Sequence, residues 1–177
     1  VVFRFRNVRA GIWKIGVKSD YDDPKFNMWL PIRQFLSSPV EFLQPEPDIT
    51  VCNPGTGSYS LTVSAYDVIR NSLYFEAGRG FTPNGAVKPE VVAPGVDITG
   101  PLPRNRYGEM TGTGVAAAFA AGIGALFLQQ YQGTVASGIT IRGIFIQGVE
   151  KRGEPYPNTE WGFGIVNAYN GLVDSLY

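Results

Sequence analysis

A turn rich in glycine and threonine leads directly into a long apolar stretch in the second half of the chain. The turn is Thr111–Gly114 (TGTG), and the stretch is Val115–Leu128 (VAAAFAAGIGALFL). Alanine, leucine and phenylalanine are compatible with a helix, and the alanines permit close packing. Because the stretch is apolar nearly all round, this helix is expected to be enclosed on every side by a domain. Its first turn, with unpaired N–H groups and a positive dipole end, adjoins the TGTG turn.

Composition excludes several classes of partner. Apolar residues make up 44% of the 177 residues, enough for a core, and the length suits one domain with part of a second. The 15 basic and 15 acidic residues balance, so neither nucleic acid nor an anionic membrane is an expected partner. The longest apolar run, 14 residues at Val115–Leu128, is shorter than the roughly 18–20 that span a bilayer. The single cysteine, Cys52, excludes an internal disulfide and is expected to be buried in a strand.

Three further segments accompany this turn and helix. They are Ile49–Tyr66 (ITVCNPGTGSYSLTVSAY), Glu76–Ile98 (EAGRGFTPNGAVKPEVVAPGVDI) and Ile139–Tyr169, which includes RGIFIQGVEKRGEPYPNTEWGFGIVNAY. Together with Tyr107–Gly122 (YGEMTGTGVAAAFAAG), they resemble segments of subtilisin-like serine proteases (subtilases, peptidase S8), in the family's order across about residues 49–172. The variants RGFTPNG and YPNTEWGFG look most like the clostridial branch, which includes the Csp proteins of spore germination.

The resemblance implies an α/β fold in two parts. Residues 49–177 would form the C-terminal part of the parallel-sheet subtilase domain. Residues 1–48 would be the end of an inserted antiparallel β module of jelly-roll type, and their alternating apolar and polar residues favour strands. We expect module strands at Val1–Asn7, Gly11–Lys18 and Met28–Ile32, sheet strands at Thr50–Val51, Leu61–Tyr66, Leu73–Phe75 and Val91–Ala93, and helices at about Gly114–Gln130, Thr140–Gly148 and Asn167–Ser175.

The chain departs from the family at the nucleophile. The usual motif is G-T-S-M-A-x-P; Gly112 and Thr113 fill its first two positions, but Gly114 stands where the serine belongs. Glycine keeps the backbone N–H, which can line an oxyanion hole, but it lacks the heteroatom that a nucleophile needs. The chain contains no histidine to act as general base, and the family's Asp, His and oxyanion Asn lie further upstream. The catalytic candidates are therefore Gly114, as the position of the lost serine, and Thr113.

Two functions are compatible with this departure. One is a pseudoprotease, a subtilase fold kept as a regulator or binding partner, in the clostridial setting during spore germination. The other is a portion of an active endopeptidase whose serine was replaced on purpose. Ala118 stands where proline is usual and Phe119 where histidine is common, and this further drift favours the pseudoprotease. A self-standing β-rich adhesion module would explain residues 1–48 but not residues 49–172.

Two polar groups suggest local structure more than chemistry. Asn53 lies in an N-P-G turn, which asparagine favours for backbone reasons. Asp20, Asp22 and Asp23 lack the glycine and the distal glutamate of a calcium loop, so a solvated hairpin loop is the better interpretation.

Four polar residues, Arg79, Glu109, Ser58 and Ser64, also have ordinary structural interpretations. Arg79 either organises the loop near the TGTG turn or makes a surface ion pair. Glu109 is expected to be an exposed loop carboxylate. Ser58 and Ser64 lie in or beside an expected strand, without any base in the chain.

The resemblance also implies partners. A protein or peptide is expected to cover the apolar helix: the chain's own N-terminal half, or a second copy. No cofactor is expected; family members often bind Ca²⁺, but this chain offers no position for it. The implied localisation is spore-associated or extracytoplasmic.

Overall fold

In the computed structural model, which describes residues 2–6, 8–31, 33–131 and 137–174, the chain forms two units, Val1–Gln44 and Pro45–Tyr177. Within the described part of the first unit, the one regular element is a short 3₁₀ helix, Arg33–Phe35.

The strands expected in the first unit are not formed in its described residues. Residues 2–6, 11–18 and 28–31 run without strand pairing, and residues 1, 7 and 32 lie outside the described part. The apolar side chains of these segments are exposed as well as the polar ones; Phe3 is 67% and Trp13 is 61% exposed. An isolated hairpin is marginal in water, and alternation fixes a strand only where one face is buried. The strand prediction is therefore wrong for these residues.

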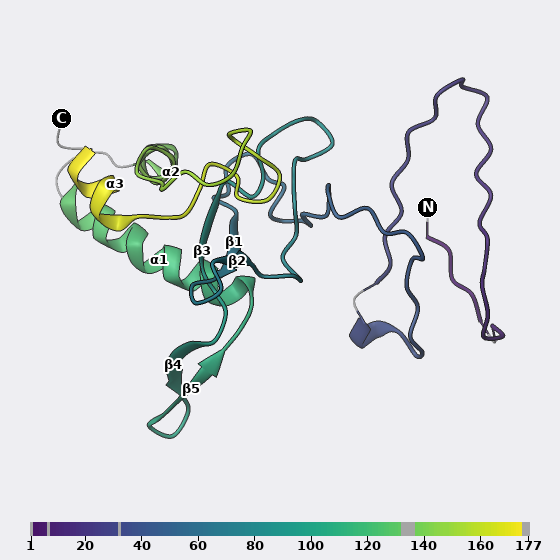
Figure 1. The fold of residues 1–177 in the computed structure, drawn as a ribbon, viewed down its shortest axis with the longest axis horizontal. Helices are drawn as coiled ribbons and strands as arrows, with labels where there is room; N and C mark the ends of the chain where they lie inside the picture. Colours follow the sequence, from purple (N-terminus) through teal and green to yellow (C-terminus); the bar gives the residue numbers. More distant parts are fainter. Residues whose placement is uncertain (1, 7, 32, 132–136, 175–177) are drawn as a thin grey trace. The chain divides into compact units, whose positions relative to one another are not determined.

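A small mixed sheet lies at the centre of the second unit (Figure 1). β1 (Val63–Asp67) pairs in parallel with the whole of β3 (Val91–Pro94). β2 (Ser72–Leu73) pairs antiparallel with the end of β1. On the other side of β3, Ile165 forms a parallel bridge with Val92. The three strands confirm the expected strands to within a few residues.

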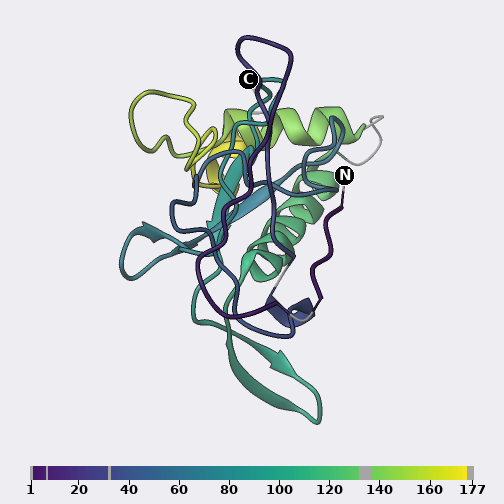
Figure 2. The ribbon, with the colours of Figure 1, turned by 90° about the vertical axis from the view of Figure 1, so that its right-hand side faces the viewer.

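A hairpin that the sequence did not predict projects from this sheet region (Figures 1 and 2). It consists of β4 (Ile98–Leu102) and β5 (Arg106–Met110), paired antiparallel along their full length. Leu102 pairs with Arg106, so the chain reverses over the three residues 103–105, of which Arg104 and Asn105 have φ angles of 65° and 54°. Glycine and proline inside the ITGPL strand hide its period, and arginine is an unusual residue at positive φ.

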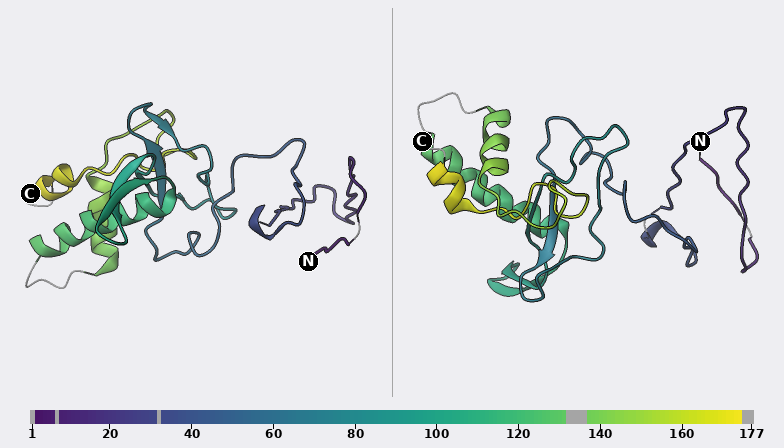
Figure 3. Two further views of the ribbon diagram at one scale, coloured as in Figure 1. Left: turned by 90° about the horizontal axis from the view of Figure 1, so that it is seen from below. Right: turned by 45° about the horizontal axis from the view of Figure 1, so that its top comes forward.

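Three helices lie together in the second unit (Figure 3). They are α1 (Thr113–Gln130), α2 (Gly138–Gln147) and α3 (Ala168–Asp174). The side chain of Ser137 caps α2 by accepting a hydrogen bond from the Thr140 N–H at 3.2 Å. The expected helices are confirmed to within two residues, although residue 175 of the last one lies outside the described part.

The core covers one face of α1. Small side chains let the helix approach the sheet closely, and the Phe127 ring packs edge-on against Phe145 of α2, with 5.0 Å between ring centres. The other faces carry exposed apolar residues, of which Phe119 is 46% exposed and Leu128 is 51% exposed. The helix is thus not enclosed on every side within this chain. Its buried residues are Ala116, Ala120, Ile123 and Phe127, packed with Ala65, Val91, Ala93, Ile144 and Phe145.

By length and composition alone, α1 is apolar enough to cross a membrane, with a mean hydropathy of 1.3 over 18 residues. The helix is longer than the 14-residue apolar run Val115–Leu128 because it also includes threonine, glycine and glutamine at its ends. A core helix of a soluble domain passes the same test, so this property does not identify a membrane span.

Two local predictions need correction. Thr50–Val51 is not a strand. Thr50 makes a backbone hydrogen bond, from its N–H to the Arg79 carbonyl at 2.8 Å. Cys52 is exposed and outside any strand. Both errors have the same cause. The N-P-G turn bends the chain immediately after this segment, before the segment can form a second backbone hydrogen bond to its neighbour.

Candidate functional site

The start of α1 is held by the turn that follows β3. The Gly112 N–H donates to the Gly95 carbonyl at 2.7 Å. The Thr111 hydroxyl accepts from the Asp97 N–H at 2.9 Å and lies 3.1 Å from the Asp97 carboxylate, to which it donates. Gly95 must be glycine here, because an added Cβ would lie 2.6 Å from the Cβ of Ala65. The APG turn and the TGTG turn therefore form one rigid corner.

Gly114 lies in the first turn of α1, exposed and free of neighbours. An added Cβ would meet no atom within 4 Å. Gly112 precedes it as the N-cap, with φ 146°, and makes no side-chain cap. The N–H groups of Thr113 and Gly114 have no acceptor within the helix. The corner thus presents backbone donors at the expected nucleophile position, together with room for a side chain.

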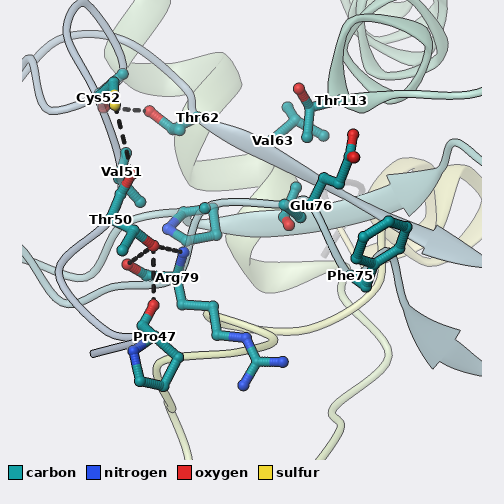
Figure 4. Close-up of a pocket in the computed structure, with 15 residues that line it drawn as sticks. Pro47, Thr50, Val51, Cys52, Thr62, Val63, Phe75, Glu76, Arg79 and Thr113 are labelled. Carbon is teal, nitrogen blue, oxygen red and sulfur yellow. Dashed lines mark hydrogen bonds between the residues drawn. The ribbon is translucent and has the colours of Figure 1, made fainter. Parts of the chain in front are cut away.

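A groove of about 560 Å³ leads to this corner (Figure 4). It lies between residues 47–55, the start of β1 and the loop 75–79, and Thr113 of α1 belongs to its lining. Thr113, one of the two predicted catalytic positions, is therefore a groove residue, whereas Gly114 adjoins it in the chain.

Reciprocal hydrogen bonds fix the outer wall of the groove. The Thr50 N–H donates to the Arg79 carbonyl at 2.8 Å, and the Arg79 N–H donates to the Thr50 hydroxyl at 2.9 Å. That hydroxyl in turn donates to the Pro47 carbonyl, also at 2.9 Å. The Arg79 guanidinium pairs with Glu160 at 2.7 Å. Both sequence interpretations of Arg79 hold: its backbone organises the wall, and its side chain forms an ion pair.

The inner wall is the edge of β1. Ser64 is only 3% exposed, lines the groove, and its hydroxyl has no hydrogen-bond partner among the described residues. β2 pairs with Tyr66 and Asp67 only. In the part of the chain that the structure describes, Val63 and Ser64 therefore have a strand on the β3 side alone, and the sheet edge at the groove is open.

Ionisable groups near the groove are held by local partners. The Tyr74 hydroxyl donates to Glu76, which lines the groove, at 2.6 Å, and this hydrogen bond raises the pKa of Tyr74. At the end of β1, the backbone N–H of Arg70 is the main cause that lowers the pKa of Asp67, with help from the Arg70 side chain and the Ile69 N–H. The carboxylates of Glu76 and Asp67 are therefore occupied by partners within their own turns.

Several sequence candidates are not brought to the groove as chemical groups. Asn53 accepts a hydrogen bond from the Thr56 hydroxyl within its turn, as a turn residue should. Glu109 and Ser58 are exposed, although Glu109 is on β5 rather than in a loop. The three aspartates of the expected hairpin loop are exposed and belong to the first unit; they are Asp20, Asp22 and Asp23. The described residues contain no group of three His, Cys, Asp or Glu side chains that could hold a metal.

Sequence reasoning missed a buried pair of charges beside the groove. Lys88 is 2% exposed and Glu90 is 0% exposed, on either side of the groove residue Pro89. The signal was present: a lysine and a glutamate stand inside the otherwise apolar run AVKPEVVAP, where charges are expected to be paired.

The chain is similar to known proteins in sequence and in fold. A family model described as the subtilase family, peptidase S8, matches residues 43–164. The CspB protease of Clostridium perfringens has a structure that superposes with a TM-score of 0.69 at 30% identity, over 75% of this chain and 31% of that chain. The serine protease AprX of Bacillus subtilis is 29% identical over 143 residues, 70% of this chain and 32% of AprX. The C5a peptidase of Streptococcus pyogenes is 32% identical over 90 residues, 51% of this chain and 7% of that protein. The chain spans about a third or less of the length of each.

Proposed function

Because the chain belongs to the subtilase family, we propose that it is the C-terminal part of a subtilisin-like pseudoprotease, a protein that binds protein or peptide without cutting it. The observation that carries the proposal is Gly114, at the start of α1, which stands where the motif resemblance puts the nucleophile and has no hydroxyl to attack. Ala118 and Phe119, which depart further from the family motif, agree with it. Residues 1–48 are proposed as the end of an inserted β module, and residues 49–177 as the end of the subtilase domain.

The likeness to the clostridial branch supports a more specific role. In that setting the protein would regulate an active partner protease during spore germination. What supports this step is the resemblance of RGFTPNG and YPNTEWGFG, together with the similarity to CspB. The second candidate, a portion of an active endopeptidase that lost its serine in one step, is favoured by the open space at Gly114.

The purified chain is expected to hydrolyse no peptide bond. It has no hydroxyl at position 114 and no general base, and the residual roughly 10³–10⁴-fold catalysis over water of triad-less proteases requires a complete binding site. The measurement is casein digestion together with labelling by a fluorophosphonate probe. Time-dependent digestion that the fluorophosphonate inhibits would contradict the proposal.

We further propose the partner of the apolar face: the preceding portion of the same subtilase domain. Phe119 and Leu126, seven residues apart on one flank of the buried stripe of α1, are each about half exposed, and Leu128 is half exposed on the opposite flank. Exposed apolar residues on a helix that also has a core-facing stripe favour an interface. The edge of β1 at Val63, which has no strand partner on the groove side among the described residues, offers backbone groups to a further strand. The chain spans 31% of CspB and 32% of AprX, so the family domain has the material to cover both.

Cys52 gives a direct test, because it is the single cysteine of the chain, is exposed, and lines the groove. Adding the separately expressed upstream portion should slow maleimide labelling of Cys52 severalfold and produce a one-to-one complex in size-exclusion chromatography with light scattering. Phe119→Asp should prevent both effects by placing a charge in the interface.

The matched control for that experiment is Ile139→Asp. Ile139 is a similarly apolar residue, 68% exposed at the start of α2, and its variant should behave like the parent chain. A monodisperse monomer whose Cys52 stays reactive in the presence of the upstream portion would show that the chain closes its own core.

A further inference from the structure

The buried charges beside the groove form one connected cluster. The Lys88 ammonium lies 2.5 Å and the Arg142 guanidinium 2.8 Å from the same oxygen, Glu90 Oε1. Neither approach has the angle of a good hydrogen bond, so the attraction is that of ion pairs. Arg142 comes from α2 and is one-third exposed. The buried carboxylate of Glu90 thus compensates the charge of the buried Lys88 ammonium and also pairs with Arg142 of α2.

The same cluster holds the segment 55–62, which contributes Gly55 and Thr62 to the groove lining. Glu90 Oε2 accepts from the Thr62 N–H at 2.7 Å, while the Glu90 N–H donates to the Thr62 carbonyl at 3.0 Å. Lys88 Nζ donates to the Ser60 carbonyl at 2.6 Å. The Thr62 hydroxyl donates to the Gly55 carbonyl at 2.5 Å, so the two ends of this segment are joined.

We propose that Glu90 is a positioning residue for the groove: its buried charge holds Lys88, and together they fix residues 55–62 as the groove wall. Isolated buried ions are costly, and removing one partner of a buried pair leaves the other uncompensated. The ammonium would then leave the carbonyl of Ser60 for water, and the wall would loosen. Arg142 carries the same constraint to α2. This inference concerns the shape of the groove and holds whichever partner the groove binds.

Hydrogen exchange read by mass spectrometry on the full 177-residue chain tests the proposal. In Glu90→Gln, the new amide oxygen can still accept from the Thr62 N–H, so the variant removes chiefly the charge. Amides of residues 55–62 are expected to exchange faster by at least about tenfold, while those of the α1 core stripe change much less. A uniform acceleration of both segments would mean that Glu90 contributes only general stability and would overturn the proposal.

Two further variants complete the design. Glu150→Gln makes the same substitution in the exposed Glu150–Arg152 pair and should leave the wall unchanged. Lys88→Met with Glu90→Gln removes both fully buried charges, and should restore most of the wall's protection because the remaining cation, Arg142, is one-third exposed and can be solvated. This double variant also decides the matter if Glu90→Gln alone does not fold. A double variant with a wall as loose as the single variant, or one that fails to fold as well, would refute a role for charge pairing.

Discussion

Gly114→Ser is expected to turn the chain into a site that a fluorophosphonate labels, provided that an upstream portion of a subtilase supplies the Asp and His. Among the described residues, an added Cβ at this position would meet no atom within 4 Å outside the helix's own backbone and the adjacent residues, so a hydroxyl can be accommodated without displacing a neighbour. The N–H groups of the first turn of α1 have no acceptor within the helix and are available to an oxyanion. In subtilisin the loss of the serine costs about 10⁶-fold in kcat, so labelling should rise by several orders of magnitude over the glycine form.

The control is the same variant in the 177-residue chain alone. Without any histidine the serine has no base, and its labelling should remain at background. Background labelling in the presence of the upstream portion would contradict the prediction. It would show that decay extends past the nucleophile, for example to Ala118 and Phe119, which replace the usual residues of the motif.

Phe127→Ala is expected to be the most destabilising single truncation on α1. Phe127 is 1% exposed and packs against Phe145 and against Gly171 of α3, where an added Cβ would lie 2.5 Å from the ring. Three helices therefore surround the ring, and none can easily move in to fill its space. Such truncations cost about 3–5 kcal/mol, which should lower the melting temperature by roughly 10 °C.

Phe119→Ala is the matched comparison, with the same side chain removed from the same helix. Phe119 is 46% exposed, so its loss should cost about 1 kcal/mol or less in the chain alone. Urea unfolding followed by circular dichroism measures both. If the two variants unfolded at the same urea concentration, the buried stripe of α1 would not be the stabilising face.

The sequence predicted the elements whose signals are local and strong. The apolar run after the TGTG turn gave α1, and the VVAP segment gave β3, because each carries its own propensity and boundary residues. The hairpin β4–β5 was missed because its strands are interrupted by glycine and proline and its turn uses Arg104. The strands expected at residues 2–6, 11–18 and 28–31 failed for the opposite reason, since their alternation is clear but none of the described residues covers their apolar side chains.

The motif predicted Gly114 and Thr113 as the catalytic positions, and that role stays a prediction. The structure adds the open space around the first and the groove at the second. Cys52 was expected to be buried and is exposed. Lys88 and Glu90 were passed over, because sequence patterns do not show that residues 28 positions apart, such as Thr62 and Glu90, meet through the parallel pairing of β1 and β3.

That parallel pairing has a consequence for how the chain reaches its fold. β3 bonds on one side to β1 and on the other to the segment around Gly164, about 70 residues later. Contacts between such distant segments require loop closure before they contribute, which makes folding slow. During synthesis, the edge of β3 that faces away from β1 would stay exposed until the C-terminal segment has emerged. Newly made protein would then be prone to edge-to-edge aggregation, and its yield should depend on chaperones more than on the final stability.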